Sequence, residues 1–345
     1  MKNRAHRTGD RKSTRLVSKE LSDLWKTPTP EGHSIAEPFR PEELAAALRR
    51  LKPRKSPGLD SIFPELILPA GLALKSWFCD FLSSCMCQLK TPKIWRRVAI
   101  PKPVKPLGNP KSYRPISLLC VPFKILERLI YIRVDPIIDP LLPRDQAGFR
   151  HGRLTVHQVT LLTQDTEDSF SAKKKPGAVF PDLTTAYDAV LHCGLTCKLL
   201  QLIPDRHMVH MIMEMVSNRS FTLATGNSKR SSLRRLKNGV PQGSVLAPLL
   251  SNTYIFDLPT TFSRKYEDAD DIAIIHADGD WRAMKGVLTK DMATVGEYLQ
   301  TWKLKLSTTK TVSAAFHLNN KLNVSLKSNT TTKPCPAVPN PHTSE

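Results

Sequence analysis

The 345-residue sequence lacks any run of 18 consecutive apolar residues, so we expect no segment that spans a membrane. Its basic N-terminus is not followed by an apolar signal core, which argues against secretion. The seven cysteines are odd in number and scattered, and no Cys-x-x-Cys pair occurs among them. These absences exclude a disulfide framework and a zinc ribbon, and they predict reduced thiols in an intracellular protein. Nucleus and cytoplasm both stay open.

Acidic residues are scarce compared with basic ones. Asp and Glu number 31 against 51 Lys and Arg, which gives a formal net charge of +20. A charge of this size predicts a polyanionic partner, either nucleic acid or an anionic membrane surface. With 40% hydrophobic residues, the chain can bury the core of one large domain or of two modest ones.

The two ends differ in composition from the middle. Residues 1–34 are polar and basic, and residues 319–345 are rich in Asn, Thr, Ser and Pro, so we expect both to be disordered. Between them, helical and strand patterns alternate irregularly, which favours an α+β fold. Helices are expected from Pro41, within 62–89, and over 123–134, 195–216, 244–254 and 287–302; strands are expected at 98–100, 178–180, 221–224, 233–236 and 272–275. We expect a charged turn at 171–177, the end of a helix at Pro136, and a hairpin in which 266–267 and 272–275 flank Asp270 and Asp271.

Three segments follow one another in the order 178–188, 239–248 and 269–274. The first places Asp182 at the end of an apolar run, and the last places Asp270 at the head of another. Adjacent strand ends would bring the two carboxylates together, where they repel unless a divalent cation lies between them. Hard oxygen ligands favour Mg²⁺, bound by carboxylates and substrate phosphates. Taken singly, each acid is better explained as an ordinary turn residue, and only the full ordered set reverses this.

The middle segment, Gly239–Ser244, is a loop with two glycines that would let backbone approach a base or sugar, and Gln242 offers both a donor and an acceptor. Taken alone, it could also be a structural turn. Lys102 and Arg114 flank a proline-rich loop and could grip a triphosphate, although solvated surface is the usual place of such residues. Three further basic residues could contact template phosphates: Lys52, Arg54 and Lys55.

Several motifs occur in the order found in one known family. They are Lys55-Ser-Pro-Gly-Leu-Asp60, Ile100-Pro-Lys102 with Ser112–Ser117, Asp145-Gln-Ala-Gly-Phe-Arg150, Phe180–Asp188, Gly239–Pro248 and Ala269-Asp-Asp271. Over about residues 40–316 the chain resembles the reverse transcriptase domain of a non-LTR (LINE-type) retrotransposon of the jockey-like group. The resemblance rests on the full ordered set, which is far more specific than any single motif.

The resemblance implies an α+β right-hand polymerase fold, with fingers and a palm whose antiparallel sheet packs on helices. The expected parts are a basic flexible segment at 1–40, fingers at 41–175, a palm at 176–318 and a disordered tail at 319–345. Because low-complexity sequence follows residue 318, we expect the family's primer grip and thumb to be missing, and we expect no endonuclease domain before residue 40.

The resemblance also implies RNA-directed DNA polymerase activity. Such a polymerase extends a DNA primer on an RNA template with dNTPs, using two Mg²⁺ ions or Mn²⁺ in their place. It makes Asp182, Asp270, Asp271 and the Leu183 carbonyl metal ligands, with the three aspartates catalytic. It makes Tyr187 a steric gate oriented by Asp188. Gln242, Gly243, Lys102 and Arg114 would bind dNTP, and Lys310 would be the general acid for pyrophosphate.

Two residues depart from the family pattern. Asp268 replaces the aromatic residue before Ala-Asp-Asp, so that four of five consecutive residues from Glu267 are acidic, which adds repulsion. Pro181 precedes the first catalytic aspartate and cannot donate a ladder hydrogen bond. An inactive nucleic-acid-binding relic of the same fold is therefore the alternative to an active polymerase. A basic scaffolding protein with coincidental motifs is the third hypothesis.

Overall fold

The computed structural model describes residues 34–96, 100–103, 113–116, 118–217, 219–221, 224–225, 229–230 and 234–317, together with residues 21 and 23. The expected disorder at 1–34 and 319–345 therefore falls almost wholly outside the described residues. The chain divides into two compact units that interleave in sequence. The first comprises residues 1–141 and 187–254, and the second comprises 142–186 and 255–345. The predicted division into fingers and palm stays a prediction.

The first unit is mainly helical. Its helices are α2 (Pro41–Arg49), α3 (Pro64–Ile67), α4 (Leu72–Cys87), α5 (Val121–Ile138), α8 (His192–Leu202), α9 (Arg206–Val216) and α10 (Ala247–Ile255), with α7 (Ala186–Ala189) and α10 reaching the unit's boundaries. Short antiparallel pairs join β1 (Ile100–Pro103) to β2 (Tyr113–Ile116), β4 (Ser220–Phe221) to β7 (Arg234–Arg235) and β5 (Ala224–Thr225) to β6 (Lys229–Arg230). Single 3-10 turns lie at Lys93–Arg96 and Asp139–Leu141.

Helix α5 is the core of this unit. Its residues Ile125, Leu126, Leu129 and Ile130 recur at helical spacing and are buried, as the sequence predicts. The expectation that Pro136 ends the helix is wrong, because α5 continues to Ile138. A proline so close to the end removes one hydrogen bond, and its fixed φ suits the helix.

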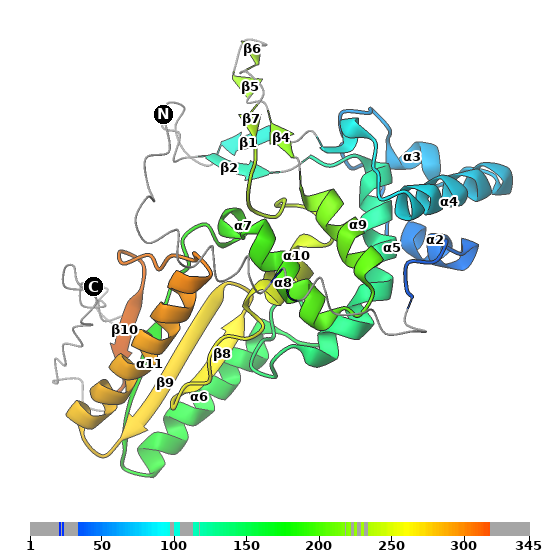
Figure 1. The fold of residues 1–345 in the computed structure, drawn as a ribbon. Coiled ribbons are helices and arrows are strands. Elements are labelled where there is room, and N and C mark those ends of the chain that lie inside the picture. The colour runs from blue at the N-terminus through cyan, green and yellow to red at the C-terminus, as the bar shows by residue number, and fades with distance from the viewer. Residues whose placement is uncertain are drawn as a thin grey trace, which may run out of the picture. The chain divides into compact units, whose positions relative to one another are not determined.

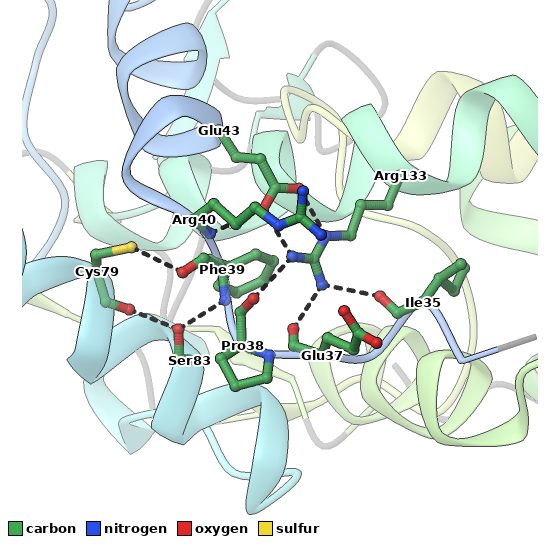
Figure 2. A network of polar contacts seen from close by, with 9 residues as sticks. All are labelled: Ile35, Glu37, Pro38, Phe39, Arg40, Glu43, Cys79, Ser83 and Arg133. Atoms are coloured by element: carbon green, nitrogen blue, oxygen red, sulfur yellow. Dashed lines mark hydrogen bonds and ion pairs between the residues drawn. The ribbon is translucent and has the colours of Figure 1, made fainter.

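Arg133 of α5 ties the segment before α2 to the helices (Figure 2). Its guanidinium forms a two-pronged ion pair with Glu43, in which Nε and one terminal nitrogen each lie 2.7 Å from a carboxylate oxygen. The same group lies over the Phe39 ring, 4.6 Å from its centre. Phe39 in turn donates its backbone N–H to Ser83 Oγ of α4 at 2.8 Å. Helices α2, α4 and α5 are thus joined by charge-assisted bonds as well as apolar packing.

The second unit is a four-stranded antiparallel sheet packed on helices, in the strand order β10-β3-β9-β8. The strands are β3 (Lys175–Phe180), β8 (Arg264–Asp268), β9 (Asp271–Asp278) and β10 (Val312–Ala315). Helices α6 (Thr155–Ser171) and α11 (Trp281–Thr301) contact the sheet, and they flank it in Figure 1. The consecutive residues Ile272–Ile275 of β9 are all buried, so both faces of this strand are covered.

Sequence patterns missed or misplaced several elements. Sequence patterns predict no helix over α6. In the structure its residues Val156, Val159 and Leu161 are exposed, so they form no buried apolar stripe. The expected turn at 171–177 is partly wrong, because β3 already begins at Lys175. The single helix expected over 195–216 is broken at Pro204 into α8 and α9. Among the described residues, no helix is both long and apolar enough to cross a membrane.

Candidate functional site

Asp182 and Asp271 pair directly with each other on adjacent segments of the sheet in the second unit. The β3–β9 register that pairs Val179 with Ile274 continues past the end of β3, and an isolated antiparallel bridge pairs Asp182 with Asp271. The sequence predicts that Asp182 meets Asp270, whereas the bridge pairs Asp182 with the neighbouring Asp271. Directly opposite residues in an antiparallel pair have Cβ atoms about 5 Å apart.

Pro181 interrupts the strand without displacing Asp182. Regular pairing with β9 ends at Val179, so the proline lies just beyond the ladder, where its missing N–H is tolerated. The backbone N–H of Asp182 donates to Thr311 Oγ1 at 3.3 Å, and its carbonyl accepts from Ser307 N–H at 2.8 Å. Leu183 continues this contact through a bridge to Leu306. The segment before β10 thus holds Asp182 in place on the side away from β9.

A tight hairpin presents the second pair of acids. Strands β8 and β9 end their pairing at Asp268 and Asp271, which leaves Ala269 and Asp270 as a two-residue turn. Ala269 has a φ of +62°, a left-handed conformation that residues with a Cβ rarely adopt. The expected hairpin around Asp270 and Asp271 is therefore present, with strain at its tip.

Lys310 lies beside the same acids. Its Nζ is 3.7 Å from Oδ2 of Asp182, and its side chain is 72% exposed. The second unit therefore contains five residues predicted from the sequence: Asp182, Leu183, Asp270, Asp271 and Lys310.

The carboxylates of this cluster repel one another. Burial raises the pKa of Asp271 first, and the charges of Asp270, Asp268 and Asp182 raise it further. Their donor atoms are all hard oxygens, which suit a divalent cation that would offset the repulsion. In the described part of the chain, no three His, Cys, Asp or Glu side chains already form a metal-binding group. The residues fit a divalent ion by charge and donor type, and the ion would complete their arrangement.

The four acids from Glu267 onward do not all crowd the hairpin tip. Glu267 is buried, its Oε1 lies 3.6 Å from Lys265 Nζ, and burial raises its pKa. Successive side chains on a strand point to opposite faces, so Asp268 lies on the other face from Glu267. There its Oδ2 accepts a hydrogen bond from Thr155 Oγ1 at 2.6 Å. Asp268 therefore adds negative charge next to Asp271, whereas Glu267 is buried beside Lys265 on the opposite face of the strand.

The glycine-rich loop lies in the first unit, together with Tyr187. Val240 N–H donates to the Tyr187 carbonyl at 2.8 Å. Gly239 has a φ of +85°, and a Cβ there would meet Asp188 Cα at 3.0 Å, so this position requires glycine. Gly243 also has a positive φ, of +96°. The first unit thus holds Tyr187 and Asp188 on one backbone segment and Gln242 and Gly243 on another, and the bond from Val240 to Tyr187 joins the two segments.

Two buried charged residues hold this loop, and sequence reasoning missed both. Glu127 of α5 accepts from Ser244 Oγ and from Val245 N–H. Burial raises its pKa to about 7. Arg219 donates to the carbonyls of Val216 and Gly239, and burial lowers its pKa to about 10. A lone glutamate inside the apolar stripe of α5 is the signal that could have identified Glu127.

The remaining predicted residues are basic and lie in the first unit. Lys102 and Arg114 are Cα partners in the β1–β2 pair, and their side chains lie outside the described residues. Lys52, Arg54 and Lys55 are exposed in the segment after α2, where Arg54 N–H donates to the Glu65 carboxylate. Register alone places Lys102 directly opposite Arg114, which concentrates positive charge on that hairpin.

Comparison with known proteins identifies the class to which this arrangement belongs. Residues 100–333 match the family described as reverse transcriptase (RNA-dependent DNA polymerase). The chain therefore belongs to the reverse transcriptase family, a family of nucleotidyltransferase enzymes that use divalent metal ions, and its α+β architecture is consistent with that fold.

The relatives are proteins of mobile elements. The chain is 33% identical over 313 residues to the probable RNA-directed DNA polymerase from transposon BS of Drosophila melanogaster, covering 87% of this chain and 34% of the relative. It is 30% identical over 300 residues to the corresponding X-element protein, covering 82% and 32%. It is also 30% identical over 273 residues to that of the jockey element of Drosophila funebris, covering 72% and 29%.

These matches confirm the resemblance to jockey-like retrotransposon proteins, and they rule out a scaffolding protein with coincidental motifs. The chain spans about one third of the length of these relatives.

Proposed function

We propose that the chain is an RNA-directed DNA polymerase domain of a retrotransposon, which adds dNTPs to a DNA primer on an RNA template. The observation that carries this proposal is the bridge between Asp182 and Asp271, with Lys310 at 3.7 Å from Asp182. In this proposal residues 41–175 form the fingers, and residues 176–318, which contribute the four-stranded sheet of the second unit, form the palm. The net charge of +20 suits a nucleic-acid partner.

The metal ligands in this proposal are Asp182, Asp270, Asp271 and the Leu183 carbonyl. Two Mg²⁺ ions, or Mn²⁺ in their place, would activate the primer 3′-hydroxyl and stabilise the departing pyrophosphate when bound. The raised pKa of Asp271 supports this assignment, because clustered carboxylates without a cation repel. Lys310 is the candidate donor of a proton to the leaving pyrophosphate.

The dNTP-binding residues are those of the first unit. Tyr187 is the proposed gate against ribonucleotides, and Gln242 and Gly243 are proposed to line the nucleotide pocket. The hydrogen bond from Val240 to Tyr187 supports a common role for gate and loop, because it fixes one relative to the other. Lys102 and Arg114 are proposed to contact triphosphate, and Lys52, Arg54 and Lys55 to contact template phosphates.

An inactive nucleic-acid-binding relic of the same fold is the second candidate. The observation in its favour is Asp268, whose charge contributes to the raised pKa of Asp271. Asp268 stands where the family carries an aromatic residue.

Primer extension on an RNA template, with dNTPs and Mg²⁺, separates the two candidates. Extension by the purified chain supports the polymerase. A folded sample that binds template-primer in a filter assay and extends nothing, with Mg²⁺ or with Mn²⁺, supports the relic.

A further inference from the structure

A short segment joins the outer edge of the palm sheet next to the hairpin. Strand β8 is the edge strand of the four, and Gln146 pairs with Glu267 of β8 in a parallel bridge. Ala147 N–H donates to the Glu267 carbonyl at 2.8 Å, and Glu267 N–H donates to the Asp145 carbonyl at 3.0 Å. These bonds bring residues 145–148 alongside the start of the Ala269–Asp270 turn.

The side chain of Gln146 forms hydrogen bonds with both the N–H and the carbonyl of Ala269 in this turn. Its Oε1 accepts from Ala269 N–H at 2.9 Å and from Gly148 N–H at 2.8 Å. Its Nε2 donates to the Ala269 carbonyl at 3.3 Å. Only 2% of Gln146 is exposed, so these bonds compete little with water.

Ala269, which Gln146 binds, has the left-handed backbone of this turn. A left-handed backbone is strained for an alanine, and such strain persists only when the surroundings hold it. The two hydrogen bonds between Ala269 and the buried Gln146 amide stabilise this conformation.

The backbone of the segment touches the same turn. A Cβ added at Gly148 would lie 1.9 Å from the Ala269 nitrogen, so no side chain fits between them. Arg150 braces the segment from behind by donating to the carbonyls of Pro143 at 2.7 Å and Gln146 at 3.2 Å. The segment is therefore built as a close-fitting support for the turn.

We propose that Gln146 is a positioning residue, which holds the Ala269–Asp270 turn so that Asp270 and Asp271 are presented beside Asp182. The effect on the turn stands on the contacts alone, and its consequence for catalysis rests on the proposed polymerase function. An amide is required because the site offers two donors, the N–H groups of Gly148 and Ala269, and two acceptors, the Ala269 carbonyl and Glu267 Oε2, which lies 3.5 Å from Nε2. A carboxylate would keep the two accepted bonds, lose both donated ones and place its charge beside Glu267 Oε2.

Hydrogen exchange at the Ala269 amide tests the contact directly. We expect Gln146→Ala to speed this exchange by about tenfold or more, because a bond worth about 1.4 kcal/mol corresponds to a factor of ten. Gln158→Ala is the matched control. Gln158 is also a buried glutamine bound to this segment: it donates to the Asp145 carbonyl at 3.1 Å rather than to the turn. Exchange at Ala269 should be unchanged in the control.

Gln146→Glu keeps the test decisive if the alanine variant does not fold. This variant retains the two accepted bonds, so Ala269 should exchange at an intermediate rate. Mn²⁺ binding, followed by electron paramagnetic resonance, should weaken in both Gln146 variants and stay unchanged in Gln158→Ala. Primer extension should show a kcat about 10- to 100-fold lower, with KM for dNTP within about twofold, as for loss of an interaction that matters in the transition state.

The results separate this inference from the proposed function. Faster exchange at Ala269 with weaker Mn²⁺ binding supports the positioning role even if the unaltered chain extends no primer, an outcome that would count only against polymerase activity. Unchanged exchange at Ala269 in a folded Gln146→Ala variant overturns the inference. An equal change in Gln158→Ala overturns it too, because the effect would then be general loosening of the segment.

Discussion

Lys310 Nζ lies 3.7 Å from Oδ2 of Asp182, so the segment before β10 supplies a cation to the acid at the end of β3. The lysine side chain is 72% exposed, and exposed ion pairs contribute about 1 kcal/mol or less to stability. The pair therefore contributes little to folding, and the role proposed for Lys310 is a chemical one. A mobile ammonium within reach of the acid cluster can approach a leaving phosphate group and donate a proton to it.

Lys310→Met should slow primer extension by about 100-fold, the lower range for loss of a general acid, and change the free energy of unfolding by less than about 1 kcal/mol. Single-turnover extension and chemical denaturation measure the two effects. Lys305→Met is the control, because Lys305 is an exposed lysine of the same segment. Equal slowing in both variants would mean that general positive charge, and not a specific proton donor, is what the segment supplies.

Asp268→Tyr should raise the rate of primer extension, because it removes one of the charges that disfavour ionised Asp271 and restores the family's aromatic residue. Thr155→Val isolates the other role of Asp268, since it deletes the hydrogen bond and keeps the charge. An unchanged rate of primer extension in Asp268→Tyr would show that Asp268 does not limit the activity.

Glu127→Gln should make stability less dependent on pH. Burial raises the pKa of Glu127 from 4.5 to about 7, while Ser244, Val245, Lys124 and Arg128 lower it, and its charge acts on Arg219 in turn. Between these pH values the folded state binds more protons than the unfolded state, so the stability from this group is full below pH 4.5 and is lost as pH rises through 7.

The loss at Glu127 amounts to roughly 3 kcal/mol for a shift of this size. Urea denaturation at pH 5 and pH 8 should therefore show a smaller difference in unfolding free energy for Glu127→Gln than for the unaltered chain. If the unfolding free energy changes equally between pH 5 and pH 8 in the two proteins, Glu127 is already ionised at pH 5.

Gly148→Ala should destabilise the second unit by about 1–3 kcal/mol, because the new Cβ would displace the backbone of Ala269. Gly286→Ala is the opposite case within the same unit. Gly286 lies in α11 with open space around it, so Gly286→Ala should raise the free energy of unfolding by about 0.5–1 kcal/mol. Thermal unfolding measures both, and a neutral Gly148→Ala would contradict the close approach of the segment to the turn.

Sequence patterns predicted best where burial follows a simple period. The stripe Ile125, Leu126, Leu129 and Ile130 predicted α5, and the continuous apolar run Ile272–Ile275 predicted strand β9 of the hairpin. Helix α6 was missed because its buried positions include Gln158 and Thr166, which no hydrophobic pattern marks. Local pattern carries no information about a helix whose apolar side chains stay exposed.

The candidate site was found through motifs, and its supports were not. Asp182, Asp271 and Lys310 come from three separate stretches, and the structure gathers them in one unit. The roles of Gln146 and Glu127 depend on partners 123 and 117 residues away in the chain. Pairings over such separations are set by tertiary structure, so periodicity cannot show them.

The most direct test compares Asp182→Asn with Asp278→Asn in primer extension on an RNA template with dNTPs and Mg²⁺. Asp278 is a partly exposed acid at the far end of β9, so it controls for loss of one negative charge from the same sheet. The account predicts that Asp182→Asn slows extension by about 1,000-fold or more, since it removes a ligand of the metal ions that stabilise the transition state. Template-primer binding should be unchanged, and Asp278→Asn should extend normally. Extension that persists in Asp182→Asn at the rate of the Asp278→Asn control would contradict the account.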